Sequence, residues 1–461
     1  MSDRTSHAIV CGAGIAGISA AYHLAVRQNM RDVLLVDERA PFSLTSDKST
    51  ECYRNWWPGP GDAMVRFMNR SIDIMEELAR ESDNCFHLSR KGYLFVTADP
   101  ARIPDFERAA EEPCALGAGP LRIHTGRSGG PVYTPAPATG FEDLPTGADL
   151  ILHPPLIQEQ FPFLSTDVVA ALHTRRCGRL SAQQLGMYML ERARECGLQL
   201  LDARVEGVDV RAGRVRAVHL SDASGSRTVG TDVFVNAAGP FVKEVGRMVG
   251  VDLPVYCELH AKIAYNDRMG IIPQSAPLYY WADAQRLPWS DEERALLAES
   301  EEMQWLLEPF PPGPHGLPEG TPGTRNQLCL WTYDVETVEP VLPLPAHDPH
   351  YFEVVIRGLS RMIPGLQAYF DRLPRPVVDG GYYTKTSENR PLVGPLPVEG
   401  AYIIGALSGF GIMAGCAAGE LLAAHVTGSG VPAYAPWFLL ERYDDPDYQA
   451  LLDDWDESGQ L

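Results

Sequence analysis

The segment 7–37 constrains the fold more than any other part of this chain. A short apolar run at 8–11 is followed by Gly-Ala-Gly-Ile-Ala-Gly at 12–17 and then by a helical pattern. A second apolar run ends at Asp37. This order of strand, glycine turn, helix, strand and acid predicts a βαβ unit of the Rossmann type.

Each glycine of this motif has a separate physical role. Gly12 permits the tight turn, Gly14 lets the backbone approach a pyrophosphate, and Gly17 lets the helix pack closely on the strand. The free N–H groups at the start of the helix attract phosphate, and Asp37, about 20 residues further on, can accept hydrogen bonds from ribose hydroxyls. A glycine turn that binds nothing is the alternative, and this context disfavours it. The sequence therefore predicts a dinucleotide site, which also includes Ile15, Ala16, Glu38 and Arg39.

Composition excludes several classes of protein. The 461 residues are enough for two or three domains, and 45% apolar with 21% charged residues is typical of a globular protein. The net charge of −21 argues against nucleic acid or anionic membrane as partners. The nine cysteines form no CxxC pair or zinc-type cluster, so we expect no metal site and a reducing compartment. No stretch is long enough to span a membrane, and the N-terminal apolar run is not typical of a signal peptide, so we expect a cytoplasmic protein.

The rest of the chain alternates helical and strand patterns. Apolar spacing predicts helices over 63–81, 181–196, 241–249, 352–363 and 411–425. Short apolar runs predict strands over 92–97, 199–204, 214–221, 231–235, 255–265, 327–333 and 401–406. Residues 112–150 are rich in Gly and Pro, and we expect an extended insertion or mobile loop there. A second insertion, 282–326, is expected to hold a helix over 289–307.

Three further segments narrow the choice of dinucleotide. They are 235–241 (VNAAGPF), 381–394 (GYYTKTSENRPLVG) and 402–413 (YIIGALSGFGIM). Together with the glycine motif, this order resembles the FAD-dependent amine and amino-acid oxidoreductases of the D-amino-acid oxidase superfamily. Monomeric sarcosine oxidase, dimethylglycine oxidoreductases and glycine oxidase are the nearest comparisons.

The resemblance implies an α/β (α+β) fold, with a Rossmann-like FAD-binding domain interleaved with an antiparallel-sheet substrate domain. The expected FAD-binding domain comprises 1–90, 175–250 and 376–440. The substrate-binding domain comprises 91–174 and 251–375, and 441–461 forms an acidic tail, which we expect to be peripheral from Asp444 on.

The resemblance also places the flavin ring between the 43–57 loop and the 380–413 segment. A reduced flavin is negative near N1, and a helix beginning near Gly411 would direct free N–H groups at that position. A glycine-rich turn before a packed helix is the alternative. The cofactor contacts expected beyond the glycine motif are Ser46, Lys48, Ser49, Thr50, Val205, Ala237, Gly239, Gly409, Gly411, Ile412 and Met413.

Two departures from the family pattern affect the cofactor. Monomeric sarcosine oxidase binds its flavin covalently through a cysteine, and the matching position here is Gly381, so we expect noncovalent FAD. The family also places a lysine near flavin N1, where this chain has Ile412. Stabilisation of the reduced flavin then falls to the helix dipole or to another lysine.

Four residues are candidates for catalysis. Lys262 resembles the lysine with which family members activate dioxygen; a surface lysine on an edge strand is the alternative. Arg54 matches an arginine that clamps a substrate carboxylate, although pairing with Glu51 or Asp62 would be purely structural. His260 is a candidate for proton transfer. Tyr382 is a candidate for the pocket wall with Trp56, Trp57, Tyr265 and Tyr383, for all of which core packing is the alternative.

These observations predict an FAD-dependent oxidase or dehydrogenase. Its substrate would be a secondary or tertiary amine or an amino acid, with hydride transfer to flavin N5 and dioxygen or another acceptor as oxidant. A flavoenzyme acting on a C–OH bond or on a ring C–N bond, a non-catalytic FAD-binding subunit, and an NAD(P) protein remain alternatives.

Overall fold

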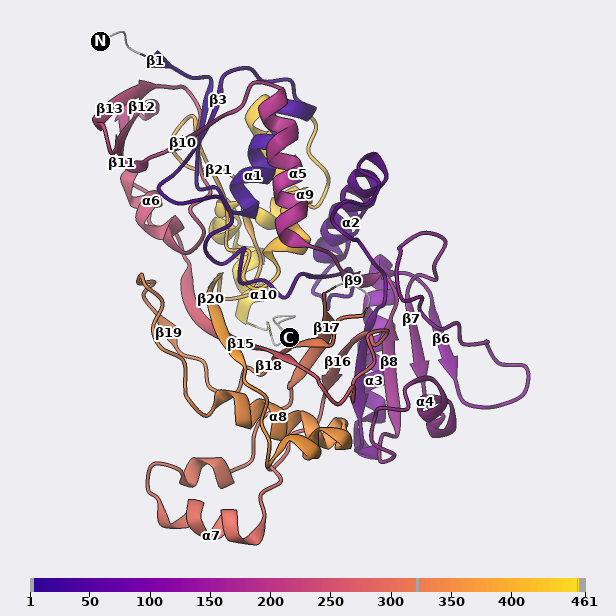
Figure 1. Ribbon diagram of the computed structural model, residues 1–461. Helices are drawn as coiled ribbons and strands as arrows, with labels where there is room; N and C mark the ends of the chain where they lie inside the picture. Colours follow the sequence, from indigo (N-terminus) through magenta and orange to yellow (C-terminus); the bar gives the residue numbers. More distant parts are fainter. Residues whose placement is uncertain (1–3, 321–322, 454, 456–461) are drawn as a thin grey trace.

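The computed structural model describes residues 4–320, 323–453 and 455 of the chain. It consists of two halves, each built on a large sheet, and the chain passes between them several times (Figure 1). None of the helices in this described part is both long and apolar enough to cross a bilayer.

A six-stranded sheet organises the half that contains the glycine motif. Its strands, in spatial order, are β10 (Gln199–Asp202), β3 (Val33–Asp37), β2 (Ala8–Cys11), β14 (Phe234–Asn236), β22 (Ala401–Gly405) and β21 (Leu392–Pro395). Neighbouring strands are parallel except β21, which runs antiparallel to β22. This arrangement confirms the predicted Rossmann-like unit.

Helices cover one face of this sheet. Alternate side chains of each strand point to opposite faces, so each strand contributes to two separate cores. Ala8 and Val10 pack into the core that contains the helices, whereas Ile9 and Cys11 pack into a second core on the other face. Helices α1 and α9 touch closely: a Cβ at Gly419 would lie 2.2 Å from Ser19 Oγ. The helices of this layer are α1 (Ile15–Tyr22), its π-helical extension η1 (His23–Arg27), α2 (Ala63–Glu81), α5 (Ala182–Glu195) and α9 (Gly411–Thr427).

The opposite face carries a smaller layer. It consists of α6 (Val242–Met248) and a four-stranded sheet of β1 (Arg4–Thr5), β13 (Gly225–Gly230), β12 (Arg214–Asp222) and β11 (Arg204–Arg211). Of these strands, β13 was not predicted, and only the first residue of β11 fell within a predicted strand.

A ten-stranded, mostly antiparallel sheet organises the second half. It contains β19 (Thr337–Val338), β15 (Tyr256–Asn266), β18 (Asn326–Leu330), β17 (His315–Glu319), β16 (Leu278–Trp281), β5 (Tyr93–Thr97), β8 (Ala170–Thr174), β7 (Ala148–Ile151) and β6 (Leu121–His124), with β20 (Val377–Lys385) paired to β15. Only β5/β16 and β6/β7 are parallel pairs. One face packs on α8 (Tyr351–Met362), and the other contributes to the core of the first half.

Shorter elements connect these layers. A two-stranded sheet pairs β4 (Cys52–Arg54) with β9 (Cys177–Arg179). The remaining α-helices are α3 (Ile103–Pro113), α4 (Pro154–Gln160), α7 (Asp291–Glu299) and α10 (Pro446–Asp453). The π-helix η3 spans Cys114–Ala118, and the 3₁₀ turns are Pro100–Arg102, Gly239–Phe241, Gln304–Leu307, Pro364–Tyr369, Ala435–Phe438 and Leu440–Asp444.

Three expectations about individual segments need correction. Residues 112–150 are not only loop, because they supply β6 and β7 to the large sheet. The helix expected over 289–307 is broken after α7, where Ser300 adopts an extended conformation. Strand β20 pairs with β15 along nine residues, so it belongs to the large sheet although the predicted boundary at 376 put it in the FAD-binding domain.

The segment from Asp444 was expected to be peripheral, but it and the residues just before it contribute buried side chains. Arg442 is 4% exposed, and its Nη2 donates to Glu388 Oε1 at 2.6 Å. Tyr448 of α10 is also buried, and its hydroxyl donates to the same oxygen at 3.0 Å. A buried carboxylate needs such donors, and this one fixes the segment against the fold. Residues 454 and 456–461 of the predicted tail lie outside the described residues.

Candidate functional site

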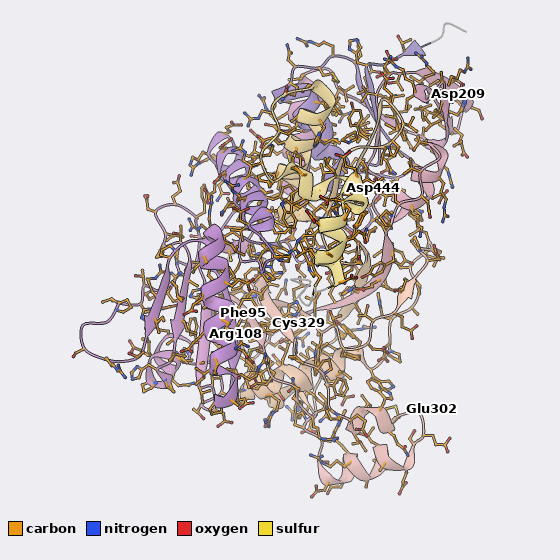
Figure 2. The ribbon with its side chains drawn as sticks, turned by 180° about the vertical axis from the view of Figure 1, so that it is seen from behind. Phe95, Arg108, Asp209, Glu302, Cys329 and Asp444 are labelled. Atoms are coloured by element: carbon orange, nitrogen blue, oxygen red, sulfur yellow. The ribbon has the colours of Figure 1, made fainter. Side chains whose placement is uncertain are left out.

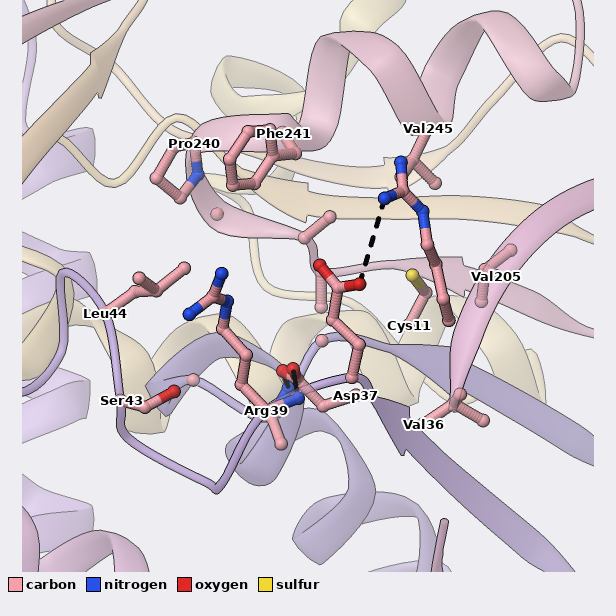
Figure 3. A pocket seen from close by; sticks show the side chains of 18 of the residues that line it. Cys11, Val36, Asp37, Arg39, Ser43, Leu44, Val205, Pro240, Phe241 and Val245 are labelled. Atoms are coloured by element: carbon pink, nitrogen blue, oxygen red, sulfur yellow. Dashed lines mark hydrogen bonds and ion pairs between the residues drawn. The ribbon is translucent and has the colours of Figure 1, made fainter. Parts of the chain in front are cut away.

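Two adjoining cavities form a groove at the carboxyl ends of β2, β3 and β14. The first has a volume of about 450 Å³ and runs past the glycine turn, Asp37 and Arg39 (Figure 3). The second, of about 90 Å³, continues to β20 and the start of α9. Both cavities are lined by Gly14, Thr45, Ser46, Ala237, Gly239 and Pro240.

The glycine turn leaves space at the point where the cavities meet. Gly12 has φ = +110°, and a Cβ there would lie 2.3 Å from the Ala237 carbonyl oxygen, so a larger residue would disrupt the turn. A Cβ on Gly17 would lie 1.8 Å from the Gly12 oxygen. Gly14 has φ = −77°, which any residue adopts, and its Cβ would project beside Ser46 Oγ at 3.1 Å. Gly14 therefore supplies room in the groove and no special backbone conformation.

Asp37 ties the end of β3 to the glycine turn. Its Oδ2 accepts a hydrogen bond from the Ala13 amide at 2.6 Å, and its Oδ1 accepts from the Arg39 amide at 2.9 Å. Burial raises the pKa of this carboxyl group, although both amides oppose the shift. Each oxygen retains a second lone pair for a ribose hydroxyl. Glu38, whose Oε2 lies 3.8 Å from Arg204 Nη1, and Val205 line the same cavity.

The second cavity lies where the resemblance places the flavin ring, and it is called the flavin slot from here on. It is lined by Lys48 and Ser49 from the loop, by 381–384 of β20 and by Gly411 at the start of α9. A Cβ on Gly409 would lie 2.3 Å from the Tyr383 ring, so glycine is required there, whereas one on Gly411 would make an ordinary contact at 3.5 Å. The groove passes the start of α1 at Gly14 and Ile15 and the start of α9 at Gly411, where free N–H groups and glycines suit the pyrophosphate and the ring of FAD.

A third, smaller cavity of about 50 Å³ shares Tyr383 and Gly409 with the second. The Arg54 guanidinium lies at this cavity, 4.3 Å from the Trp57 ring centroid, and burial lowers its pKa. The other lining residues are Thr50, Tyr93, His260, Leu278, His315, Leu330, Thr332, Phe410 and Met413. A buried cation and two imidazoles thus meet beside the flavin slot.

The two imidazoles are held by different partners. His260 stacks on Tyr383 with ring centroids 3.9 Å apart, and its Nε2 lies 2.8 Å from Glu258 Oε2. His315 Nδ1 donates to the Gly313 carbonyl at 2.8 Å. Burial lowers the pKa of His260, against the effect of Glu258, and burial lowers the pKa of His315 to about 4. Both rings are therefore neutral near pH 7.

The predicted lysines differ in position. Lys48 lines the second cavity, and its Nζ pairs with Asp47 at 2.8 Å and with Asp379 at 2.9 Å. Lys262 Nζ donates to the Ser49 carbonyl at 3.0 Å and stands behind the residues that line the flavin slot. Burial lowers the pKa of Lys262.

The predicted aromatic wall is only partly correct. Trp57 and Tyr383 line the third cavity, but the Tyr382 hydroxyl is bonded to both the amide and the carbonyl of Val341 and does not face it. Trp56 Nε1 donates to the Ala109 carbonyl, and Tyr265 packs in the core around α8. Tyr383, rather than Tyr382, thus stands between the flavin slot and the third cavity.

Sequence reasoning missed two polar residues of this cavity. His315 lies in β17 and Thr332 follows β18. β17 was not predicted, because it falls in a segment rich in Pro and Gly, and a single His there gave no periodic signal. Among the cofactor residues, Thr50 and Met413 line the third cavity and not the flavin slot.

Known proteins resemble this chain in sequence and in fold. Human mitochondrial dimethylglycine dehydrogenase is 24% identical over 326 residues, which are 66% of this chain and 32% of that protein, so the chain spans about a third of that relative. The structure of L-proline dehydrogenase from P. horikoshii has a TM-score of 0.72 at 19% identity and covers 96% of this chain and 98% of its own.

Glycine oxidase from Geobacillus kaustophilus shares the same fold, with a TM-score of 0.70 at 15% identity over 96% of this chain and 99% of its own. The family model described as FAD dependent oxidoreductase, DAO, matches residues 7–425. The chain belongs to the DAO family of FAD dependent oxidoreductases.

Proposed function

We propose that this chain uses noncovalently bound FAD to oxidise a C–N bond of a small secondary or tertiary amine, or amino acid, that carries a carboxylate. The observation that supports this most strongly is the third cavity. It adjoins the flavin slot at Tyr383 and Gly409 and contains the buried guanidinium of Arg54. Its small volume, about 50 Å³, favours a small substrate.

Arg54 is the proposed carboxylate site. A guanidinium binds a carboxylate through two parallel hydrogen bonds, which are strong when both groups are shielded from water.

FAD, when bound, accepts a hydride equivalent from the carbon next to the substrate nitrogen. The protein must then bind the amine in its neutral form over the ring. His260 is neutral near pH 7, so it can take the proton of an incoming ammonium group. Trp57, Tyr93 and Phe410 exclude water from the cavity.

The names of the relatives support the substrate class. Dimethylglycine, proline and glycine, the substrates named for the three proteins above, each combine an amine with a carboxylate. We propose the same class of substrate, an amine that carries a carboxylate, for the present chain, without choosing one compound.

Noncovalent attachment is supported by the lining of the flavin slot. Among its described residues there is neither Cys nor His, the side chains through which a flavin ring is most often attached, and Gly381 faces Lys48. We further propose dioxygen as electron acceptor, with the half-buried Lys262 ammonium, which is bonded to the Ser49 carbonyl, as the charge that assists it. Acid precipitation of the protein should release all of its FAD into the supernatant; flavin that stays in the pellet would contradict noncovalent binding.

Oxidation of the C–OH bond of a 2-hydroxy acid is the competing activity, because Arg54 would bind that carboxylate equally well. Product analysis by mass spectrometry separates the two. An N-methylated amino acid should be converted either to the demethylated amino acid and formaldehyde or to methylamine and a 2-oxo acid, because the iminium product formed at either carbon hydrolyses. Turnover of the matching hydroxy acid to a keto acid, with the amine untouched, would overturn the proposal.

A further inference from the structure

On β15 and β20, next to the third cavity, the charged side chains of Glu258 and Lys385 form a chain that ends at His260. Lys385 Nζ lies 3.1 and 3.2 Å from the two Glu258 oxygens, and Glu258 Oε2 lies 2.8 Å from His260 Nε2. On the far side of the ring, His260 Nδ1 lies 3.4 Å from Thr332 Oγ1. All three charged or titratable side chains are at most 15% exposed.

This geometry defines one tautomer of the imidazole. An ionised carboxylate only accepts hydrogen bonds, so His260 Nε2 must carry the hydrogen that Glu258 receives. Nδ1 is then the unprotonated nitrogen, and the Thr332 hydroxyl donates to it. His260 and Thr332 line both the third cavity and a further cavity of about 170 Å³, so the contact between Nδ1 and Thr332 lies at the border of the two.

We propose that Glu258 and Lys385 are positioning residues for His260: Glu258 holds the Nε2–H tautomer, so that Nδ1 receives the proton released by the substrate ammonium, and Lys385 holds Glu258. This inference rests on the proposed function. The Thr332 hydroxyl relays the proton: its oxygen takes the proton from the substrate nitrogen while its own hydrogen passes to Nδ1. The positive charge that forms on the imidazole is balanced by the Glu258 carboxylate. No electrons are transferred in this step.

The two positioning residues act on the imidazolium with opposite sign. Glu258 stabilises the positive ring and Lys385 destabilises it. The other groups around His260 are Tyr383, stacked on the ring from β20, and Arg54 and His315, which line the same cavity from β4 and β17. A further cavity that His260 lines also contains Tyr333, Asp334, His347, Asp348 and Tyr351. They are unchanged in the variants below, so the two effects can be compared directly.

The experiment measures the rate of anaerobic flavin reduction against pH, at saturating amine, in the FAD-loaded protein. In Glu258→Gln, the acidic limb of the plot of rate against pH should move to lower pH by about one unit or more, because the imidazolium of His260 loses its counter-charge and the pKa of His260 falls. For Lys385→Met the limb should move to higher pH. Limbs that coincide with wild type in both variants, or that move in the same direction, would overturn the inference.

A matched control is available in another His–carboxylate pair of the chain. His219 Nε2 lies 3.0 Å from Asp209 Oδ1 on the small sheet, and Figure 2 labels Asp209 at one end of the molecule. Neither residue lines any of the three cavities. Asp209→Asn changes the net charge by the same amount as Glu258→Gln and should leave the pH profile unmoved. A shift in this variant equal to that of Glu258→Gln would also overturn the inference.

A second readout does not depend on activity. Long-range ¹H–¹⁵N spectra of protein with labelled histidine report the tautomer of each ring, and His260→Asn identifies the relevant signal. Wild type should show hydrogen on Nε2, and Glu258→Leu should lose this preference even if it cannot bind FAD. An Nδ1–H tautomer in wild type would overturn the inference. Failure of every amine to reduce the flavin would instead contradict the proposed function and leave the spectra to decide the tautomer.

Discussion

The imidazole of His260 lies on the phenol ring of Tyr383, with ring centroids 3.9 Å apart and planes inclined by 12°. Strand pairing places Gly381, not Tyr383, directly opposite His260. Because position 381 has no side chain, the imidazole can lean toward its diagonal neighbour across the strands. This contact fixes His260 against the residue that stands between the flavin slot and the third cavity, and it is the basis of the chemistry proposed here.

Substitution of Gly14 by Val should abolish FAD binding without unfolding the protein. Its φ of −77° accommodates any residue, but the added carbons would fill the groove beside Ser46. Flavin absorbance per mole of purified protein checks this, with Gly430→Ala, where a Cβ meets no atom within 4 Å, as control. Gly12→Ala should behave differently and lower the free energy of unfolding by about 1–3 kcal/mol from backbone strain alone. Wild-type flavin occupancy in Gly14→Val would contradict the assigned groove.

Substitution of Arg54 by Met should weaken binding of carboxylated amines. Loss of one partner of a buried charge pair typically costs about 2–5 kcal/mol, a rise of roughly 30-fold or more in KM. The KM of the same amine without its carboxylate should rise much less, because that amine has no group that binds the guanidinium. Steady-state kinetics with such a pair of substrates measures the difference, and an equal effect on both would remove Arg54 from the binding site.

Substitution of Lys262 by Met should slow reoxidation of the flavin by dioxygen more than its reduction by substrate. Negative charge develops on oxygen in the first electron transfer, and loss of a fixed ammonium nearby costs on the order of a hundredfold in rate. Stopped-flow measurement of the two half-reactions separates the effects. Lys243→Met is the control, because that lysine bonds to the Val255 carbonyl away from the flavin slot. Equal or absent effects in Lys262→Met would show that this residue does not assist dioxygen.

Substitution of Glu388 by Gln should destabilise the fold by about 3–5 kcal/mol, as expected when one partner of a buried ion pair is removed. Glu388 Oε1 receives hydrogen bonds from Arg442, Tyr443 and Tyr448. Burial raises the pKa of Glu388, but Arg442 and the hydrogen bonds outweigh it and leave the pKa below its usual value.

A depressed folded-state pKa means that this stabilisation is present above the unfolded pKa of the carboxyl group and is lost as pH falls through the folded pKa. Urea unfolding of wild type and Glu388→Gln between neutral and acidic pH tests this. The free energies of unfolding of the two proteins should become equal at acidic pH. The exposed Glu441→Gln should change little at any pH. A constant difference between wild type and Glu388→Gln across the pH range would contradict the assigned ion pair.

The sequence predicted the parts of this protein that have strong periodicity. The helix over 63–81 and the strand–turn–helix at 8–22 follow from apolar spacing and from glycines whose roles are local. β6 and β7 were missed because Gly and Pro around them conceal two four-residue strands whose stability comes from pairing in the large sheet.

The site was harder to predict for a similar reason. Tyr382 and Tyr383 are adjacent, and only the pairing of β20 with β15 decides which one faces His260. His315 approaches the cavity from a strand that carries no alternating pattern. Such residues come together through contacts between distant segments, which a single sequence does not record.

The central claim is that an amine with a carboxylate meets bound flavin at the cavity of Arg54, His260 and Tyr383. Anaerobic titration of the FAD-loaded protein with small N-methylated amino acids measures this directly, through the flavin absorbance. The account predicts full bleaching by at least one of them, at one equivalent per flavin, and little bleaching by the same amine without its carboxylate. Flavin that stays oxidised with every amine, or that is bleached equally without the carboxylate, would contradict it.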